Sequence, residues 1–159
     1  MPVNTKKVAS RRDVHYRSLD DIAVDAKRLA EVEVRTDGNW SQGQIYDHLA
    51  KNFNGSIDGM GFAMPAPVRL LMGLLMKKKF LTKGIPPGFK TNAKLEPPQV
   101  STSDAIEALT KAIERLKREE TRAMHPLFGK ISREEWDEFH LRHAEMHTSF
   151  LMEANGTSD

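Results

Sequence analysis

Apolar residues recur at helical rather than strand spacing along most of the chain. Between Ser18 and Val34, leucine, isoleucine and alanine return every three or four residues, which predicts a first amphipathic helix. The turn-rich cluster Thr36-Asp37-Gly38-Asn39 follows it. We find no convincing run in which β-branched and polar residues alternate, so no strand is expected. The pattern therefore indicates an all-α protein.

Local start and stop signals place the next two helices. Ser41-x-x-Gln44 is a capping box, in which each side chain bonds the backbone N–H of the other residue, and it predicts a helix from Ser41 to about Asn54 that ends at Gly55. The segment 64–82 is expected to be a further helix, because prolines stand at its start and a glycine follows its end.

A proline-rich loop, 84–100, precedes the third long helix. Loops of this length are either functional lids or long connections, and both interpretations stay open. Thr102 or Ser103 is expected to cap the helix that follows, which ends before His125-Pro126. Its buried face is predicted to carry Ile106, Leu109, Ile113 and Leu116.

A second capping box, Ser132-x-x-Glu135, opens a last helix that is expected to run to about Ala154. The chain then has four amphipathic helices and one long crossover connection that contains an extra helix. This organisation is typical of a helical bundle.

Composition and charge mainly exclude classes of protein and kinds of functional site. The 159 residues fit one domain, expected at 18–154 between a flexible N-terminal tail, 1–17, and a flexible C-terminus, 155–159. Hydrophobic residues at 39% and charged residues at 29% are typical of a soluble globular protein. The formal net charge of +2, without a basic stripe, argues against nucleic-acid binding. The absence of cysteine excludes disulfides, thiolate metal sites and a cysteine nucleophile.

The N-terminus is polar and basic and lacks the apolar stretch of a secretory signal, which predicts a cytoplasmic location. The longest apolar run, within 64–81, is interrupted by Arg69 and is too short for a membrane span. No membrane-crossing segment is therefore expected.

Four of the six histidines are candidates for chemistry, because they occupy apolar helix faces. Successive helical residues turn by about 100°, so His140, His143 and His147 share one face of the last helix. The same face carries Trp136, Phe139 and Phe150. His48 lies on the apolar face of the second helix. All four are predicted to point inward.

Two interpretations of these inward histidines follow. Each can be a packed core residue bonded to a carbonyl or carboxylate, since buried polar groups find partners. Alternatively, the pair His143-x3-His147 and the facing His48 can hold one divalent metal ion and leave a coordination position open.

The other histidines are less informative. His140 lies one turn before His143 and can be a hydrogen-bond partner of a ligand, an alternative ligand or a proton shuttle. His125 and His15 are predicted to be ordinary loop or surface residues.

Two known kinds of metal site are excluded by position. A zincin needs glutamate directly after the first histidine, where this chain has Ala144, and Glu145 points away from the histidine face. A di-iron carboxylate bundle needs several inward glutamates, and the inward faces offer none.

The histidine pattern resembles a known family. The residues that carry the likeness are Trp40-Ser41, Gln44, Ile45, His48-Leu49 and His143-x3-His147. They resemble the DinB and YfiT-like superfamily of metal-binding four-helix bundles. The blocks GNWSQGQIYDHL and HPLFGKISREEWDEFHLRHAEMHTSF resemble more narrowly a branch whose members are mostly of unknown function. The similarity covers about residues 18 to 153.

The resemblance implies a DinB-like four-helix bundle with an additional helix and a proline-rich loop in the long crossover connection. It places the metal ligands on His48, His143 and His147 and implies nickel, zinc or iron. Characterised members of the superfamily include thiol-dependent transferases, which implies a low-molecular-weight thiol as a cosubstrate. Many relatives carry a further histidine and a glutamine where this chain has Thr148-Ser149-Phe150.

Two functions are therefore considered. The first is a metal-dependent enzyme that acts on a small-molecule substrate by thiol transfer or hydrolysis, with no acid or base residue assigned. The second is a non-catalytic binding or interaction module with a structural metal or none, whose partner surface is the segment LLMGLLMKKKF. A homodimer is compatible with either function.

Overall fold

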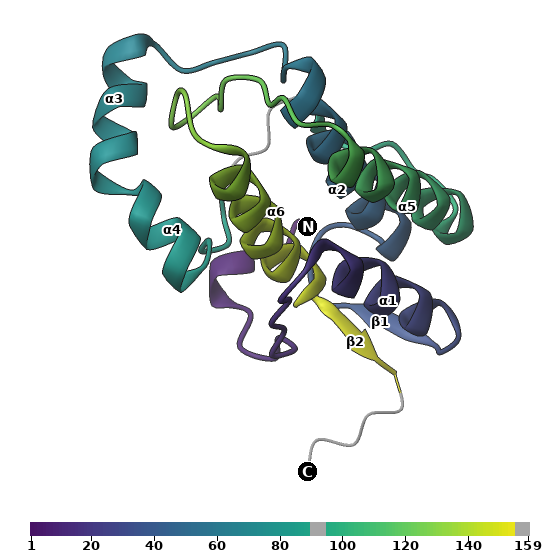
Figure 1. The fold of residues 1–159 in the computed structure, drawn as a ribbon. Coiled ribbons are helices and arrows are strands. Elements are labelled where there is room, and N and C mark those ends of the chain that lie inside the picture. Colours follow the sequence, from purple (N-terminus) through teal and green to yellow (C-terminus); the bar gives the residue numbers. More distant parts are fainter. Residues whose placement is uncertain (90–94, 155–159) are drawn as a thin grey trace.

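The computed structural model describes residues 1–89 and 95–154, and these residues are mostly helical (Figure 1). A short two-stranded antiparallel sheet accompanies the helices. The helices are η1 Thr5–Lys7, α1 Leu19–Ala30, α2 Gln42–Asp58, α3 Ala66–Leu75, α4 Lys77–Lys83, α5 Thr102–Arg118 and α6 Arg133–Thr148, and the strands are β1 Val34–Thr36 and β2 Leu151–Glu153. The expectation of an all-α fold is confirmed in this broad sense.

One hydrophobic core is shared by α1, α2, α5 and α6. The most extensive helix contact is between α2 and α5, which lie side by side in Figure 1. Burial of these apolar faces is the main source of stability for such helices. The core includes Ile22 and Leu29 of α1, Ile45, Leu49 and Phe53 of α2, Leu109, Ile113 and Leu116 of α5, and Leu141 and Ala144 of α6.

Both predicted capping boxes are confirmed. The Ser41 side chain accepts from the Gln44 N–H while the Gln44 side chain accepts from the Ser41 N–H. Ser132 and Glu135 make the same reciprocal pair at the start of α6. These local hydrogen bonds fix where α2 and α6 begin, and hence the registers of the faces that carry the histidines.

The predicted end of α2 is wrong. The helix continues through Gly55 to Asp58 and ends at Gly59, whose φ of 95° lies in the left-handed region that favours glycine. The Met60 side chain packs over Gly55 inside the helix.

Two further boundaries differ from the prediction. The N-cap of α5 is Ser101, whose hydroxyl accepts from the Asp104 N–H, rather than Thr102 or Ser103. The segment 64–82 forms two helices, α3 and α4, which meet at Met76. The chain direction changes between the two helices (Figure 1), and Phe80 of α4 is buried.

The expectation that the chain has no strand is also wrong. The first helix was expected to reach Val34 and the last one Ala154, but α1 ends at Ala30 and α6 at Thr148. The released segments pair as β1 and β2, with Val34 opposite Glu153 and Thr36 opposite Leu151. Each strand has only three residues, which is too short to display a period of two.

The N-terminal segment has defined contacts. Arg12 makes a two-pronged ion pair with Asp25 of α1. The Tyr16 side chain is buried, and its hydroxyl donates to Asp25 and lies 2.9 Å from Thr148 Oγ1. The mobility expected for residues 1–17 stays a prediction, whereas residues 155–159 lie outside the described residues. Among the described residues, none of the helices has the length and apolar character needed to cross a bilayer.

The close packing of α2 on the start of α5 requires a glycine. A Cβ atom at Gly43 would lie 2.3 Å from the backbone oxygen of Val100. At Gly55, in the same helix, a Cβ would instead lie 2.5 Å from the Sδ atom of Met60, which belongs to a flexible side chain and not to the backbone.

We expect Gly43→Ala to lower the free energy of unfolding by about 2 kcal/mol, because the backbone at Val100 must move. Helix propensity alone would favour the alanine by about 1 kcal/mol. Gly55→Ala is the matched control and should be neutral or stabilising. Urea unfolding of the three proteins checks this, and equal stability of the two variants would contradict it.

Candidate metal centre

Three histidines from two helices converge between α2 and α6. His48 of α2 and His143 and His147 of α6 each offer one ring nitrogen, and these nitrogens all lie within 4.8 Å of one another. The Nε2 atoms of His143 and His147 are 3.0 Å apart. The ring centroid of His48 lies 5.2 Å from that of His143 and 4.7 Å from that of His147. The structure thus brings together the three predicted ligand residues.

The proline-rich loop orients the His48 ring. Its Nδ1 atom lies 2.8 Å from the carbonyl oxygen of Leu95. A carbonyl only accepts, so Nδ1 carries the proton and Nε2 keeps a lone pair. The side-chain amide of Asn52 lies 3.2 Å from this Nε2 atom and can donate to it. The loop therefore selects the tautomer of His48 that can bind a metal through Nε2.

The rings of His143 and His147 are held in the neutral form. Burial is the main cause that keeps the pKa of each imidazole well below its ordinary value, and the neighbouring histidines lower both pKa values further. Neutral imidazole is the form that ligates metals. Without an ion, the short Nε2–Nε2 contact requires that one ring carries its proton on Nε2 and donates a hydrogen bond to the Nε2 atom of the other ring.

The donor set fits a transition-metal ion. Two nitrogens on one tetrahedral ion, each bound at about 2.0–2.1 Å, are about 3.3 Å apart, close to the separation of His143 and His147. Metal-binding histidines commonly donate their second N–H to a carbonyl, as His48 does to Leu95. Three imidazoles suit zinc, nickel or iron. The Nδ1 atom of His143, by contrast, is buried and has no hydrogen-bond partner among the described residues.

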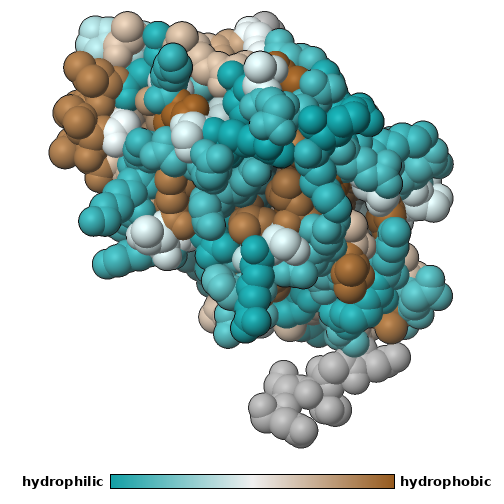
Figure 2. Space-filling model, viewed as in Figure 1, coloured by the Kyte–Doolittle hydropathy of each residue, from teal (hydrophilic) through white to brown (hydrophobic). Residues whose placement is uncertain are grey.

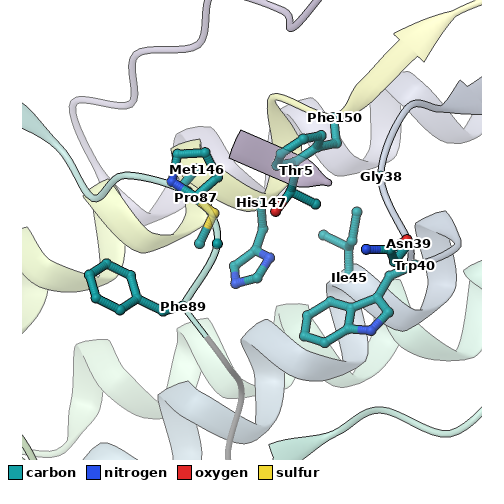
Figure 3. Close-up of a pocket in the computed structure, with 11 residues that line it drawn as sticks. Thr5, Gly38, Asn39, Trp40, Ile45, Pro87, Phe89, Met146, His147 and Phe150 are labelled. Carbon is teal, nitrogen blue, oxygen red and sulfur yellow. The ribbon is translucent and has the colours of Figure 1, made fainter. Parts of the chain in front are cut away.

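A small cavity of about 170 Å³ adjoins this cluster. Figure 3 shows the His147 imidazole between Phe89 on one side and Trp40 on the other. The Trp40 ring stacks on His147 with a centroid distance of 5.3 Å. The predicted role of the 84–100 loop is clarified in part, since Pro87 and Phe89 form a wall of the cavity, while residues 90–94 lie outside the described residues.

His140 is not part of the three-nitrogen cluster. It is fully buried, and its Nε2 atom lies 2.9 Å from Ser56 Oγ. The Ser56 hydroxyl donates to the Phe53 carbonyl, so His140 Nε2 is the donor in this pair. Its ring stacks on Trp136. Of the interpretations left open for the inward histidines, this arrangement is that of a packed core residue.

The expectation for His125 is wrong in one respect. The residue lies in a loop, but it is only 2% exposed. Its Nδ1 atom accepts from the N–H groups of Leu127 and Phe128. Its ring packs against Phe128 and Trp136, and burial lowers its pKa to about 3. Phe128 is three residues away in the same loop, but Trp136 and Phe139 belong to α6, and their packing on His125 could not be seen from the local sequence. The His15 side chain is 65% exposed, as expected for a surface residue.

Glu145, which was excluded as a catalytic base from its position on the helix, has other partners in the structure. Glu145 accepts from the Tyr16 N–H and lies 3.1 Å from Arg142, so it serves the N-terminal segment rather than the histidine cluster. Among the described residues, no aspartate or glutamate lines the cavity beside His147.

Comparison with known proteins gives a family match without an assigned activity. The family model described as "Protein of unknown function (DUF1569)" matches residues 8–154. No curated protein and no solved structure matches the chain.

The buried histidines make the metal-free protein sensitive to acid. Their pKa values are lowered in the folded state, above all by burial, while an unfolded histidine has a pKa of about 6.5. The unfolded chain therefore binds more protons below pH 6.5. The stability that comes from keeping these rings neutral in the folded protein is present above the unfolded pKa of about 6.5. It is lost as the pH falls below that value.

We expect the free energy of unfolding to fall by about 1 kcal/mol for each of His125, His140, His143 and His147 between pH 7 and 5.5. Most carboxyl groups stay ionised in this window, so their contribution is small. Urea unfolding with a chelator present, at the two pH values, measures the change. Equal stability at both would show that these rings can take up protons without unfolding.

Proposed function

The chain belongs to the DUF1569 family, and we propose that it holds one divalent metal ion on His48, His143 and His147 and acts as a metal-dependent enzyme on a small molecule. The observation that carries the proposal is the convergence of three neutral imidazoles, two of them with Nε2 atoms 3.0 Å apart. Nickel, zinc and iron are among the ions that imidazole ligands suit.

We also propose that the fold is a DinB-like four-helix bundle built from α1, α2, α5 and α6. The core shared by these four helices supports it, as does the position of α3, α4 and the proline-rich loop in the connection between α2 and α5. At Thr148 and Ser149, where the sequence departs from that superfamily, both side chains contact the N-terminal segment. Thr148 Oγ1 meets the Tyr16 hydroxyl, and Ser149 accepts from Arg11.

The cavity beside His147 supports a catalytic rather than a purely structural ion. When bound, such an ion supplies Lewis acidity, which lowers the pKa of a water or thiol nucleophile. The neutral histidines leave the charge of the ion uncompensated. Trp40 and Phe89 give the cavity two aromatic walls, which suit a small, largely apolar group.

Two reaction classes fit these residues. One is transfer of a low-molecular-weight thiol to an electrophile, and the other is hydrolysis of a small molecule. Neither requires an acid or base from the described cavity walls if the nucleophile loses its proton to solvent. The alternative is a non-catalytic module in which the ion only stabilises the packing of α2 on α6.

We expect protein purified without an affinity tag or chelator to contain about one divalent ion per chain, measured by elemental mass spectrometry. His48→Ala and His147→Ala should each lose the ion, because two imidazoles bind it far more weakly than three. His15→Ala is the matched control, since this histidine lies at the surface, and should keep the ion.

Circular dichroism establishes that each variant is folded. Native protein that stays free of metal after nickel, zinc and ferrous ions are supplied would overturn the proposed site and favour packed core histidines. Metal content that persists in both folded variants would do the same.

The open coordination position is tested separately with cobalt. We expect the visible spectrum of the cobalt-loaded protein to change when a small thiol is added, because a thiol reaches the ion through the cavity beside His147. Removal of the ion at pH 7.5 should leave the chain folded. A visible spectrum that does not change when small ligands are added, together with unfolding when the metal is removed, would indicate a structural ion and the non-catalytic alternative.

A further inference from the structure

Helix α3 presents an apolar face to solvent. Its leucines Leu70, Leu71, Leu74 and Leu75 are 67%, 55%, 74% and 65% exposed, and no residue of the helix is buried. At about 100° per residue, these four cover an arc of about 140° on one side of the helix. Figure 2 shows a hydrophobic group at the upper left, where Figure 1 places α3. Soluble monomers rarely leave such a contiguous face uncovered.

The opposite side of α3 is fixed against the rest of the protein. A Cβ atom at Gly73 would lie 3.2 Å from the backbone oxygen of Phe128, so the helix backbone approaches this loop closely. Val68 and Met72 lie on the same inner side and are partly buried. A rotation that turned the leucines inward would place their bulk at this close approach to the Phe128 backbone. The apolar face is therefore directed outward by the packing of Gly73.

The same part of the chain is strongly basic. Residues 59–95 contain no aspartate or glutamate but seven lysine or arginine residues. The other 17 basic residues of the chain are outnumbered by its 22 acidic residues. The seven are Arg69, Lys77, Lys78, Lys79, Lys83, Lys90 and Lys94.

The lysines at the start of α4 directly follow the leucine face. Lys77 pairs with Glu135, whereas Lys78 and Lys79 are exposed and have no ion pair among the described residues. Charge that is not compensated within the protein thus borders the apolar face, an arrangement typical of segments that lie in a lipid interface.

We propose that the leucine face of α3, together with Lys78 and Lys79, docks on an anionic lipid bilayer. The leucines enter the boundary between headgroups and acyl chains, and the lysines contact lipid phosphates. The ten-residue helix is about 15 Å long, so it lies in the plane of the membrane and does not cross it. The acidic excess elsewhere is repelled by the same surface, which orients the protein with α3 towards the lipid.

Charge favours this occupant over a second copy of the chain. A symmetric contact through α3 would bring together two basic segments, neither of which contains an acidic residue to compensate the other. An anionic headgroup layer supplies the missing negative charge. The inference does not depend on the proposed metal centre, because no residue of α3 or α4 belongs to that cluster.

The test is flotation of the full chain with vesicles of equal parts phosphatidylcholine and phosphatidylglycerol, compared with vesicles of phosphatidylcholine alone. We expect binding to the anionic vesicles that weakens as salt is added. Lys78→Gln/Lys79→Gln should reduce the partition coefficient about 25-fold, roughly fivefold per lysine. Leu70→Gln/Leu74→Gln should reduce it at least about tenfold.

The matched control is Val24→Gln/Lys27→Gln, which replaces one exposed apolar residue and one exposed lysine on α1 and should bind normally. Absence of binding to anionic vesicles at low salt overturns the proposal. So does loss of binding in only one of the two α3–α4 variants, because both insertion and charge are required. A stable dimer in the absence of lipid that Leu70→Gln/Leu74→Gln dissociates also overturns it, since the face would then be a contact between copies.

Discussion

The burial of uncharged imidazole rings against α2 and α6 is the constraint on which the rest of the structure depends. A buried ring that cannot take up a proton needs a hydrogen-bond partner in a fixed direction. His48 finds a carbonyl in the proline-rich loop, His140 a serine on α2, and His125 two N–H groups of its own turn. These hydrogen bonds form only if two helices have the right register and two loops follow the right course. The helix starts, set by capping boxes, provide that registration.

Much of the helical framework could be predicted because its signals are local. The capping boxes at Ser41 and Ser132 involve residues three positions apart, and the inward faces follow from helical periodicity. The sheet could not be predicted, since each strand has three residues and its partner is more than a hundred residues away. Nor could the burial of His125, because two of the aromatic rings that cover it, Trp136 and Phe139, belong to α6. The sequence of α3 does not show which way its leucines face, and their outward direction is seen only from their exposure in the folded chain.

The candidate site could also be predicted in part, because the spacing of its residues along the helices is a local signal. Spacing on α6 fixes the relation of His143 to His147, while the contribution of His48 required only that α2 face α6. What selects the His48 tautomer could not be foreseen, because the Leu95 carbonyl belongs to a loop 47 residues away with no repeating pattern. The cavity wall formed by Phe89 comes from the same loop. Pairing of Tyr16 with Thr148 likewise ties the N-terminal segment to the end of α6, through residues 132 positions apart.

The bond between His48 and the Leu95 carbonyl has a thermodynamic consequence. The loop that orients this ring also supplies the wall of the cavity at Pro87 and Phe89. A ligand that displaces the wall therefore also acts on the orientation of a proposed metal ligand. Because such coupling is reciprocal, a factor by which the ligand changes metal affinity is the factor by which the metal changes ligand affinity. Selectivity for ion and for ligand would then evolve together in this loop, outside the helices that provide the three histidines.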